Sequence, residues 1–429
     1  MQYLFLRQQF FVKGKEDKNM VDAIKKNIEE IIKWANLVFL FMFSLHLFNF
    51  PDKYIILWYT FSIALFWLLH KELCLDKMFW VLSLAIILNG IGTYYYLAES
   101  LSYSIGDIIK MVVPTILVYP FMKQFMCNKQ DADVEKIILA IVVGTFIYSM
   151  LNYYMLAKYG FYKGDYRGWS DFWTNYSWRA THHSYWGCFV AGLLGYAIYC
   201  LYEKKWLKGL LFIGMVIIEN YIQIAGDNRM VLCVTVVALA VSLALFCFMN
   251  IKDSNKIKKV LFAVLIIVII GIVFLWLDPF GIRSSGYYQR FVTRNGGILK
   301  NDRFLMIYEA ILMLPSHWKG GATMYAGGNY WVHNYWLQVA NVSGIVPFVL
   351  WMIVNISAVG DVIRLIRSPY VSNKIKYMFI PMLSSIVGYL MMEPGGTELN
   401  RYIIFYVMLL AILKQLANKK EMNVGIEDV

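Results

Sequence analysis

The sequence predicts an all-α polytopic membrane protein with about 12 transmembrane helices and one long extracytoplasmic loop that contains an amphipathic helix. Two features of the composition support this prediction. Of the 429 residues, 59% are hydrophobic and only 16% are charged, whereas soluble domains contain about 25% charged residues. The third observation is that apolar runs close to the 20 or so residues that cross a bilayer as a helix recur along the chain.

The apolar runs define twelve predicted spans within a single transmembrane domain, residues 34–416. Residues 1–33 are predicted to be a cytoplasmic N-terminus, in which "MVDAIKKNIEEIIKWA" is typical of an amphipathic helix lying in the membrane interface. Residues 417–429 are predicted to be a cytoplasmic tail. The predicted spans are 34–50, 54–70, 78–98, 104–122, 137–157, 184–202, 207–225, 230–250, 260–277, 335–360, 377–392 and 401–416.

Lys and Arg in the loops predict the orientation, because the cytoplasmic loops of membrane proteins are enriched in both. With the N-terminus inside, cytoplasmic segments carry 26 of the 40 basic residues, outer segments carry 13, and Lys110 lies within a span. The net charge of +12 therefore follows from topology, and no nucleic-acid partner is needed to explain it.

The outer basic residues differ in kind from the inner ones: the inner segments hold 23 Lys and 3 Arg, and the outer segments hold 5 Lys and 8 Arg. Arg is the better bidentate partner for phosphate and carboxylate, so this bias favours an anion site on the outer side. The alternative is that these arginines pair with outer acids such as Asp171 and Asp302. The outer arginines are Arg167, Arg179, Arg229, Arg283, Arg290, Arg294, Arg303 and Arg401.

The outer side also carries the two long loops, residues 158–183 and 278–334. The first is rich in Tyr, Trp and Gly. In the second, "NDRFLMIYEAILMLPSHW" places apolar residues at helical spacing and ends at Pro315. It predicts an amphipathic helix over the outer mouth of the bundle, with Arg303 in its first turn; the alternative for Arg303 is a solvated helix face.

His333, in "NYWVHNYWLQVANVSGIVPF", lies where the second loop re-enters the membrane. A histidine titrates near neutral pH and can act as a general base; the alternative is an interfacial residue that caps or solvates the helix end. Asn334 is suited either to fixing the loop or to binding a sugar hydroxyl. Gly344 allows close helix packing.

Two further arginines begin spans on the outer side. Arg229 lies in the short hairpin "IAGDNRMVLC", at the depth of a lipid-linked phosphate; snorkelling or pairing with Asp227 is the alternative. Arg401 follows "EPGGTELN" and opens the last span, where headgroup anchoring is the alternative.

The remaining polar groups within the spans predict structure more than chemistry. Charges in a bilayer are costly and are usually paired or functional. Lys110 and Glu219 both fall in the outer part of their helices, so we expect them to form a structural pair.

No metal or other cofactor is expected. His182, His183, His317 and His333 all face outward, but no two of them have ligand spacing on a helix face. None of the six cysteines has zinc-site spacing, and their places imply no disulfide framework.

Three segments, taken together, resemble the bacterial O-antigen ligase and O-antigen polymerase superfamily. "HNYWLQVANVSGIVP" is similar to the family's His-Asn, nine residues, Gly pattern, with His333, Asn334 and Gly344. Pro347 departs from the family, which often has Gly, Thr or Tyr there. "GDNRMVLCVTVVALA" is similar to the family's small residue, Arg and apolar run, with Arg229. "DRFLMIYEAILMLPSHWKGGA" is similar to its Arg, helix, Pro and Gly stretch. The motifs cover roughly residues 226–347.

The resemblance implies a metal-independent, inverting glycosyltransferase. Such enzymes move a glycan from undecaprenyl pyrophosphate to an acceptor hydroxyl at the outer side of the bacterial cytoplasmic membrane. Carried over, His333 becomes the base on the acceptor hydroxyl, and Arg229 and Arg303 hold the pyrophosphate. We expect Asn334 and Arg401 to bind substrate as well.

In this interpretation the outer loops supply further substrate contacts. Trp and Tyr of residues 158–183 would stack on sugars while Arg167 and Arg179 reach phosphates or acidic sugars; an interfacial aromatic belt is the alternative. We also expect Arg290 of the long loop to bind substrate.

The main functional hypothesis is a polymerase that joins lipid-linked repeat units into a surface polysaccharide, with membrane lipids around it. A ligase that transfers the finished glycan to lipid A core or another acceptor is the nearest alternative. A polysaccharide transporter or flippase is the third, although no internal repeat supports it.

Overall fold

The apolar runs fold into helices, as their length and composition predict. The structure is a computed structural model that describes residues 2–46, 52–71, 73, 75–101, 104–127, 130–161, 168–173, 177–226, 228–255, 257–258, 260, 262, 269, 273, 276–277, 302–322, 332–393 and 400–419. Its helices are α1 (Gln2–Ser44), α2 (Asp52–His70), α3 (Lys77–Leu101), α4 (Ile105–Phe125), α5 (Asp131–Tyr159), α6 (Ala180–Ala191), α7 (Leu193–Tyr202), α8 (Trp206–Ala225), α9 (Met230–Met249), α12 (Asp302–Met313), α13 (Tyr335–Ser343), α14 (Ile345–Arg367), α15 (Asn373–Met392) and α16 (Asn400–Ala417). Two strands, β1 (Gly168–Ser170) and β2 (Ser177–Arg179), complete it.

The all-α membrane class is confirmed, since nine helical segments in the described part are long and apolar enough to cross a membrane. The predicted number of about twelve stays a prediction. The predicted span 34–50 falls partly in α1, which runs without a break from the N-terminal segment. The predicted span 260–277 lies largely outside the described residues. α16 contributes a shorter apolar helix, Tyr402–Ala417.

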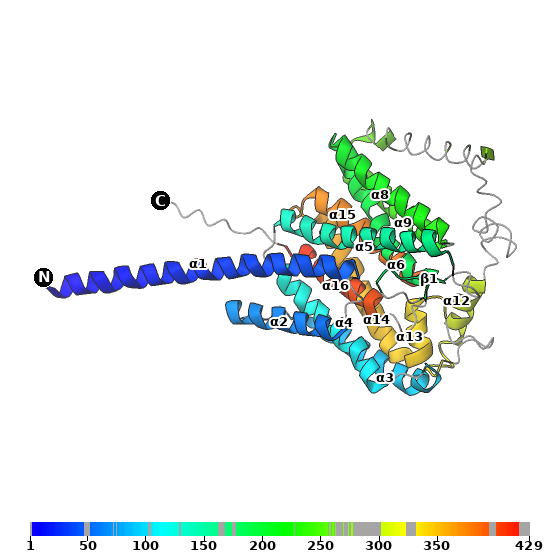
Figure 1. The fold of residues 1–429 in the computed structure, drawn as a ribbon, viewed down its shortest axis with the longest axis horizontal. Helices are drawn as coiled ribbons and strands as arrows, with labels where there is room; N and C mark the ends of the chain where they lie inside the picture. The colour runs from blue at the N-terminus through cyan, green and yellow to red at the C-terminus, as the bar shows by residue number, and fades with distance from the viewer. Residues whose placement is uncertain are drawn as a thin grey trace.

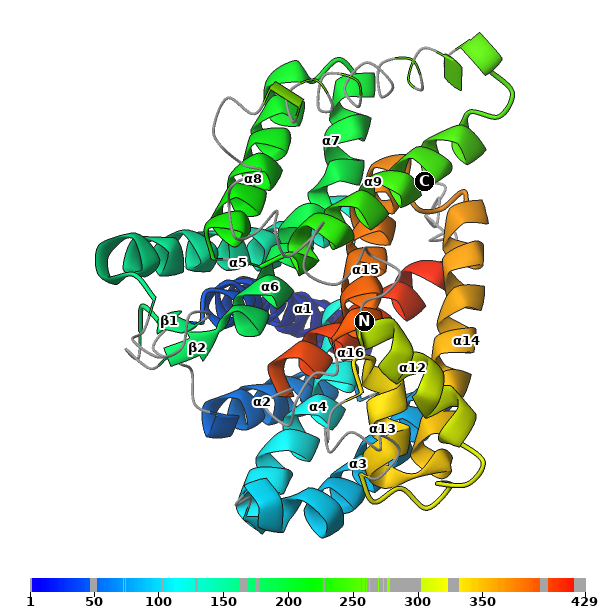
Figure 2. The ribbon, with the colours of Figure 1, turned by 90° about the vertical axis from the view of Figure 1, so that its right-hand side faces the viewer.

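α16 is the centre of the bundle (Figures 1 and 2). Every residue from Ile404 to Leu413 is buried, so this helix presents no lipid-facing side. A helix that is apolar all round belongs in the interior of a bundle. It packs against α4, α14 and α15.

Ion pairs divide the bundle into two faces. We call the end that holds Asp76, Lys123 and Lys414 the terminal face, because α16 ends there, and the opposite end, with β1, β2, α12 and the start of α13, the loop face (Figure 1). Every ion pair between different described segments joins parts of the chain that the loop charges place on the same side. This agreement supports the predicted alternation of the spans.

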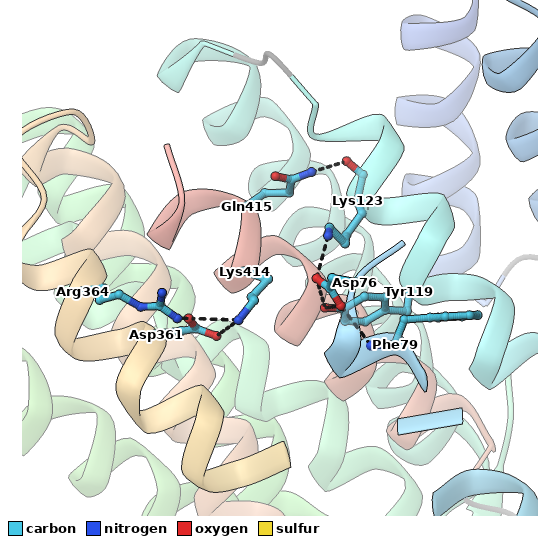
Figure 3. Close-up of polar contacts among 8 residues, drawn as sticks. All are labelled: Asp76, Phe79, Tyr119, Lys123, Asp361, Arg364, Lys414 and Gln415. Atoms are coloured by element: carbon cyan, nitrogen blue, oxygen red, sulfur yellow. Dashed lines mark hydrogen bonds and ion pairs between the residues drawn. The ribbon is translucent and has the colours of Figure 1, made fainter. Parts of the chain in front are cut away.

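Polar contacts close the terminal face (Figure 3). Nζ of Lys123 on α4 lies 2.6 Å from the carboxylate of Asp76, which also accepts a hydrogen bond from the Tyr119 hydroxyl. Asp361 of α14, which is fully buried, pairs with Lys414 at 3.2 Å and with Arg364. Gln415 Nε2 then donates to the Lys123 carbonyl at 2.9 Å. These polar contacts thereby tie α4, α14 and α16 together at this end.

The predicted span 335–360 is wrong in its bounds, because Gly344 divides it. α13 ends at Ser343 and α14 begins at Ile345. With 23 residues, α14 extends about 34 Å, enough to cross the roughly 30 Å hydrocarbon core alone. His333 therefore precedes a short helix that leads into the span. Pro347 lies in the first turn of α14, where proline costs no helical hydrogen bond.

Gly344 adopts φ 88° and ψ −177°, a conformation that is essentially restricted to glycine. The segment after α12 packs directly on this break. The Ile345 N–H donates to the Trp318 carbonyl at 2.8 Å, and the Gly321 N–H donates to the Val342 carbonyl at 3.1 Å. A Cβ at position 344 would lie 2.6 Å from the Trp318 oxygen. The break in the helix thus anchors the loop that carries α12.

The side chains of α13 pack it against the neighbouring helices. Residues Tyr335–Val342 are all buried. Tyr335 meets Trp351 of α14 edge to face at 5.6 Å between ring centroids, and Trp336 meets Tyr406 of α16 at 6.4 Å. The aromatic residues that follow His333 therefore fix α13 over the end of the central helix.

The loop 158–183 contains a short antiparallel ribbon, in which Trp169 of β1 faces Trp178 of β2. Trp169 is only 2% exposed and packs against Gly226, where a Cβ would lie 2.6 Å from the indole. Tyr148 of α5 donates to Asp171 at 2.5 Å. Trp169 is therefore a packing residue in this structure, and sugar stacking by the other aromatic residues of the loop stays a prediction.

Gly344→Ala should lower the free energy of unfolding by about 1–3 kcal/mol, because alanine is strained at this φ and ψ. The control is Gly360→Ala, which lies exposed on the same helix and has open space around its Cβ position. Thermal unfolding of both variants in detergent tests this prediction. Equal stability of the two variants would show that Gly344 is not required at the break.

Candidate functional site

Three elements meet on the loop face at the C-terminal end of α15. Arg303 lies in the first turn of α12, His333 and Asn334 immediately precede α13, and Glu393 caps α15. Arg303 and Glu393 are 90 residues apart in sequence. The structure therefore brings His333, Arg303 and Asn334 together and adds Glu393 to them.

Glu393 is the centre of this cluster. Its side chain is 6% exposed, and its Oε1 accepts a hydrogen bond from Nη1 of Arg303 at 2.6 Å. The same Nη1 donates to the Met392 carbonyl at 3.2 Å. Nδ1 of His333 lies 3.7 Å from Oε2 of Glu393, which is an ion-pair distance and longer than a hydrogen bond. One buried carboxylate thus faces two basic groups.

The two basic groups determine the charge state of Glu393. Burial alone raises the pKa of this carboxyl group, but His333 and Arg303 lower it by more, so the pKa lies below its usual value of 4.5. Glu393 is therefore ionised at neutral pH. Its buried charge is stabilised because both partners lie within ion-pair distance.

The backbone around His333 is fixed by neighbouring side chains. Oδ1 of Asn334 accepts from the Leu337 N–H at 3.0 Å and caps α13, while its Nδ2 donates to the Met391 carbonyl of α15 at 3.2 Å. Oε1 of Gln338 accepts from the Val332 N–H at 2.7 Å. Of the two roles considered for Asn334, these contacts favour fixing the loop, because both polar atoms of its side chain are occupied.

The His333 ring is partly buried, and its atoms differ in exposure. Its side chain is 26% exposed, yet Nδ1 is buried and has no hydrogen-bond partner among the described residues. The exposed part of the ring therefore comes from its other atoms. A ring whose Nδ1 faces Glu393 and whose other atoms are exposed can accept a proton at Nε2.

Arg229 occupies the N-cap position of α9, at the same face. Its guanidinium and that of Arg303 are both close enough to Cys233, one turn into α9, to favour the charged form of its thiol. The two arginines therefore lie near the N-terminal end of this helix. The alternative partner of Arg229, Asp227, lies outside the described residues.

A buried polar chain fixes the turn that carries Arg229. Oε1 of Glu219 accepts from Nε2 of Gln223 at 2.7 Å and from the Ser149 hydroxyl at 3.1 Å. Asn228 donates to Oε1 of Gln223 at 3.0 Å and accepts from the Met230 N–H at 3.0 Å. This series of hydrogen bonds therefore links α5 to the beginning of α9 through α8.

These contacts show that the predicted pair of Lys110 and Glu219 is wrong. Lys110 lies 2.9 Å from Asp107 on an exposed face of α4, whereas Glu219 is fully buried and bonded as described above. Lys110 and Glu219 were assigned to similar depths, but depth does not specify which helices are neighbours.

The remaining predicted residues are not tested by the structure. Arg167 and Arg290 lie outside the described residues. Arg179 lies in β2 and Arg401 in the first turn of α16, but their side chains lie outside the described part. Their proposed contacts with substrate stay predictions.

The sequence analysis missed Glu393, although it quoted the segment "EPGGTELN" in which this residue stands. The available signal was an acidic residue directly after an apolar span, on a face rich in arginine.

Among the described residues, no group of His, Cys, Asp and Glu is arranged to hold a metal ion. The polar groups of the cluster can instead bind an anion and accept a proton.

No protein-family model matches this chain, and no curated protein sequence does so either. The motifs and the geometry of this cluster therefore carry the evidence for function.

Glu393→Gln should reduce the free energy of unfolding by about 1–3 kcal/mol above pH 5, since it removes a charged hydrogen bond to Arg303. Because the pKa of Glu393 is lowered in the folded protein, its contribution is present above the ordinary carboxyl pKa of 4.5 and is lost as the pH falls through the lowered value. The difference between wild type and variant should therefore shrink below about pH 4.5.

Unfolding of the detergent-solubilised protein as a function of pH measures this difference. The control is Glu309→Gln, which removes a carboxylate from α12 that forms no ion pair with any described residue. A difference that is independent of pH would contradict the assignment of a charged Glu393.

Proposed function

We propose that this protein is a membrane glycosyltransferase that moves a glycan from undecaprenyl pyrophosphate to a sugar hydroxyl. The observation that carries the proposal is the convergence of His333, Arg303 and Glu393 at one face of a helical membrane bundle. A proton acceptor next to a guanidinium is what a transfer with an anionic leaving group requires. The resemblance of the surrounding motifs to O-antigen polymerases and ligases supports the same chemistry.

In the proposed reaction, Nε2 of His333 takes the proton of the acceptor hydroxyl as its oxygen attacks the anomeric carbon of the donor. The bond from that carbon to the pyrophosphate oxygen breaks, and undecaprenyl pyrophosphate leaves with the electron pair. A single displacement of this kind inverts the anomeric configuration. The energy comes from the pyrophosphate leaving group, so the reaction needs no nucleotide.

Arg303 and Arg229 have the charge and position to bind the leaving group. Both are close enough to Cys233 to favour the charged form of its thiol, so they lie near the same end of α9. Guanidinium groups stabilise the negative charge that develops on phosphate oxygens as the bond breaks. Arg229 lies at the end of a membrane helix, a suitable depth for the phosphate of a lipid carrier.

Polymerisation of lipid-linked repeat units into a surface polysaccharide is the activity that we propose for this centre, with ligation to lipid A core or another acceptor as the alternative. The two differ in the acceptor. Purified protein given lipid-linked oligosaccharide as sole substrate should lengthen it if it is a polymerase. If products form only when a second acceptor is added, the protein is a ligase.

His333→Ala should lower the release of undecaprenyl pyrophosphate from lipid-linked glycan by about 100- to 10,000-fold, since it removes the general base. Arg229→Ala should also reduce release severely. The matched controls are His317→Ala, on the segment after α12, and Arg367→Ala, at the end of α14; both should keep wild-type rates.

The measurement is chromatographic detection of undecaprenyl pyrophosphate with purified variants. Normal release by His333→Ala would exclude the proposed base. A wild type that releases none would exclude the proposed function, including both acceptor alternatives.

The proposed location is the bacterial cytoplasmic membrane, with both termini in the cytoplasm and the loop face outside. In a cysteine-free background, a membrane-impermeant thiol reagent should label Lys319→Cys in intact cells and leave Lys252→Cys unlabelled until the cells are opened. Both positions are exposed in the structure. The reverse labelling pattern would invert the topology and place the cluster inside.

A further inference from the structure

The contacts of Glu393 are unequal. Its hydrogen bond to Arg303 is short, 2.6 Å, whereas the Nδ1 atom of His333 is 3.7 Å from the other carboxylate oxygen, about 0.8 Å beyond a usual hydrogen bond. Nδ1 is buried without a hydrogen-bond partner among the described residues. An unsatisfied buried nitrogen is costly, so a small movement that satisfied Nδ1 would be favourable. In the resting site, without a bound substrate, Glu393 is thus hydrogen-bonded to Arg303 and not to His333.

We propose that Glu393 couples the two halves of the site: the anionic pyrophosphate of the donor draws Arg303 away from Glu393, and the released carboxylate then accepts a hydrogen bond from Nδ1 of His333. This inference rests on the proposed function and makes Glu393 a positioning residue for His333. Its consequence is that the base becomes fully effective only after the donor has bound.

Arg303 is the partner that can move. Its side chain is 24% exposed, whereas that of Glu393 is 6% exposed, and the Glu393 backbone is fixed by donation of its N–H to the Tyr389 carbonyl at 2.9 Å. α12 contributes Ala310 to a small apolar cluster with Val332 and Leu337. A pyrophosphate offers a guanidinium more negative charge than one carboxylate does and bidentate geometry as well.

The charge balance explains why this exchange would activate His333. Among the described residues, Glu393, from the end of α15, forms an ion pair with the ring, and Arg303, from α12, forms one with Glu393, while α13 presents the neutral Asn334 and Gln338. In the resting site the positive charge of Arg303 offsets the negative charge of the Glu393 carboxylate. Without this offset, Glu393 stabilises the protonated ring and fixes the tautomer whose Nε2 accepts a proton.

A titration of His333 tests the coupling directly. The protein is labelled with ¹⁵N-histidine, the His333 signal is assigned with His333→Ala, and the midpoint of titration is measured with and without inorganic pyrophosphate. The anion raises the midpoint in any variant that binds it. In the wild type the rise should exceed that of Glu393→Gln by about one pH unit. Equal rises in both proteins, or no rise in the wild type, would overturn the proposal.

Kinetics supply a readout that a purely structural role would not change. Glu393→Gln should lower kcat by about 10- to 100-fold and shift the acidic limb of the pH–rate profile to lower pH, and Glu393→Asp should restore part of both. Glu309→Gln, the charge-matched control on α12, should behave as wild type. An active Glu393→Gln with an unshifted profile would exclude the coupling and leave the proposed function intact. A wild type that releases no undecaprenyl pyrophosphate would instead exclude the function itself.

Discussion

The loop face depends on one buried negative charge. A carboxylate cannot be taken out of water at the end of a membrane helix unless cations and hydrogen-bond donors replace the lost solvent. Glu393 meets this requirement with Arg303 from α12 and His333 from the start of α13. The charge therefore holds together three segments that the sequence separates widely, and it defines where they meet.

The position of His333 follows from a second constraint, the break at Gly344. Since α14 is long and apolar enough to cross a membrane without α13, α13 is available to lie over the end of α16, with its aromatic residues in contact with Trp351 and Tyr406. Asn334 links the beginning of α13 to the last turn of α15. Pro347 conflicts with a continuous helix from residue 335 but is well placed in the first turn of a new one. The departure from the family motif thus has a local structural reason.

The two faces of the bundle use charge differently. On the terminal face, Lys123, Asp361 and Lys414 form pairs that tie helices together (Figure 3). On the loop face, a buried glutamate is shared between an arginine and a histidine that are each about a quarter exposed. The first arrangement is suited to closing the bundle, and the second leaves polar groups within reach of a ligand.

Local properties of the sequence determined the membrane class and the positions of most apolar helices, and they predict the alternation of sides, because hydropathy and loop charge act over a single helix or loop. The same local signals selected His333, Arg303 and Arg229 as polar residues that are predicted to lie outside. They did not identify Glu393, the structural role of Asn334 or the division at Gly344. Nor did they separate Lys110 from Glu219, which were expected to pair. Each of these depends on which helices are neighbours, and contacts such as that between Arg303 and Glu393 join residues whose separation in sequence leaves no periodic pattern. The tertiary structure alone decided them, because only packing places a distant carboxylate beside a given base.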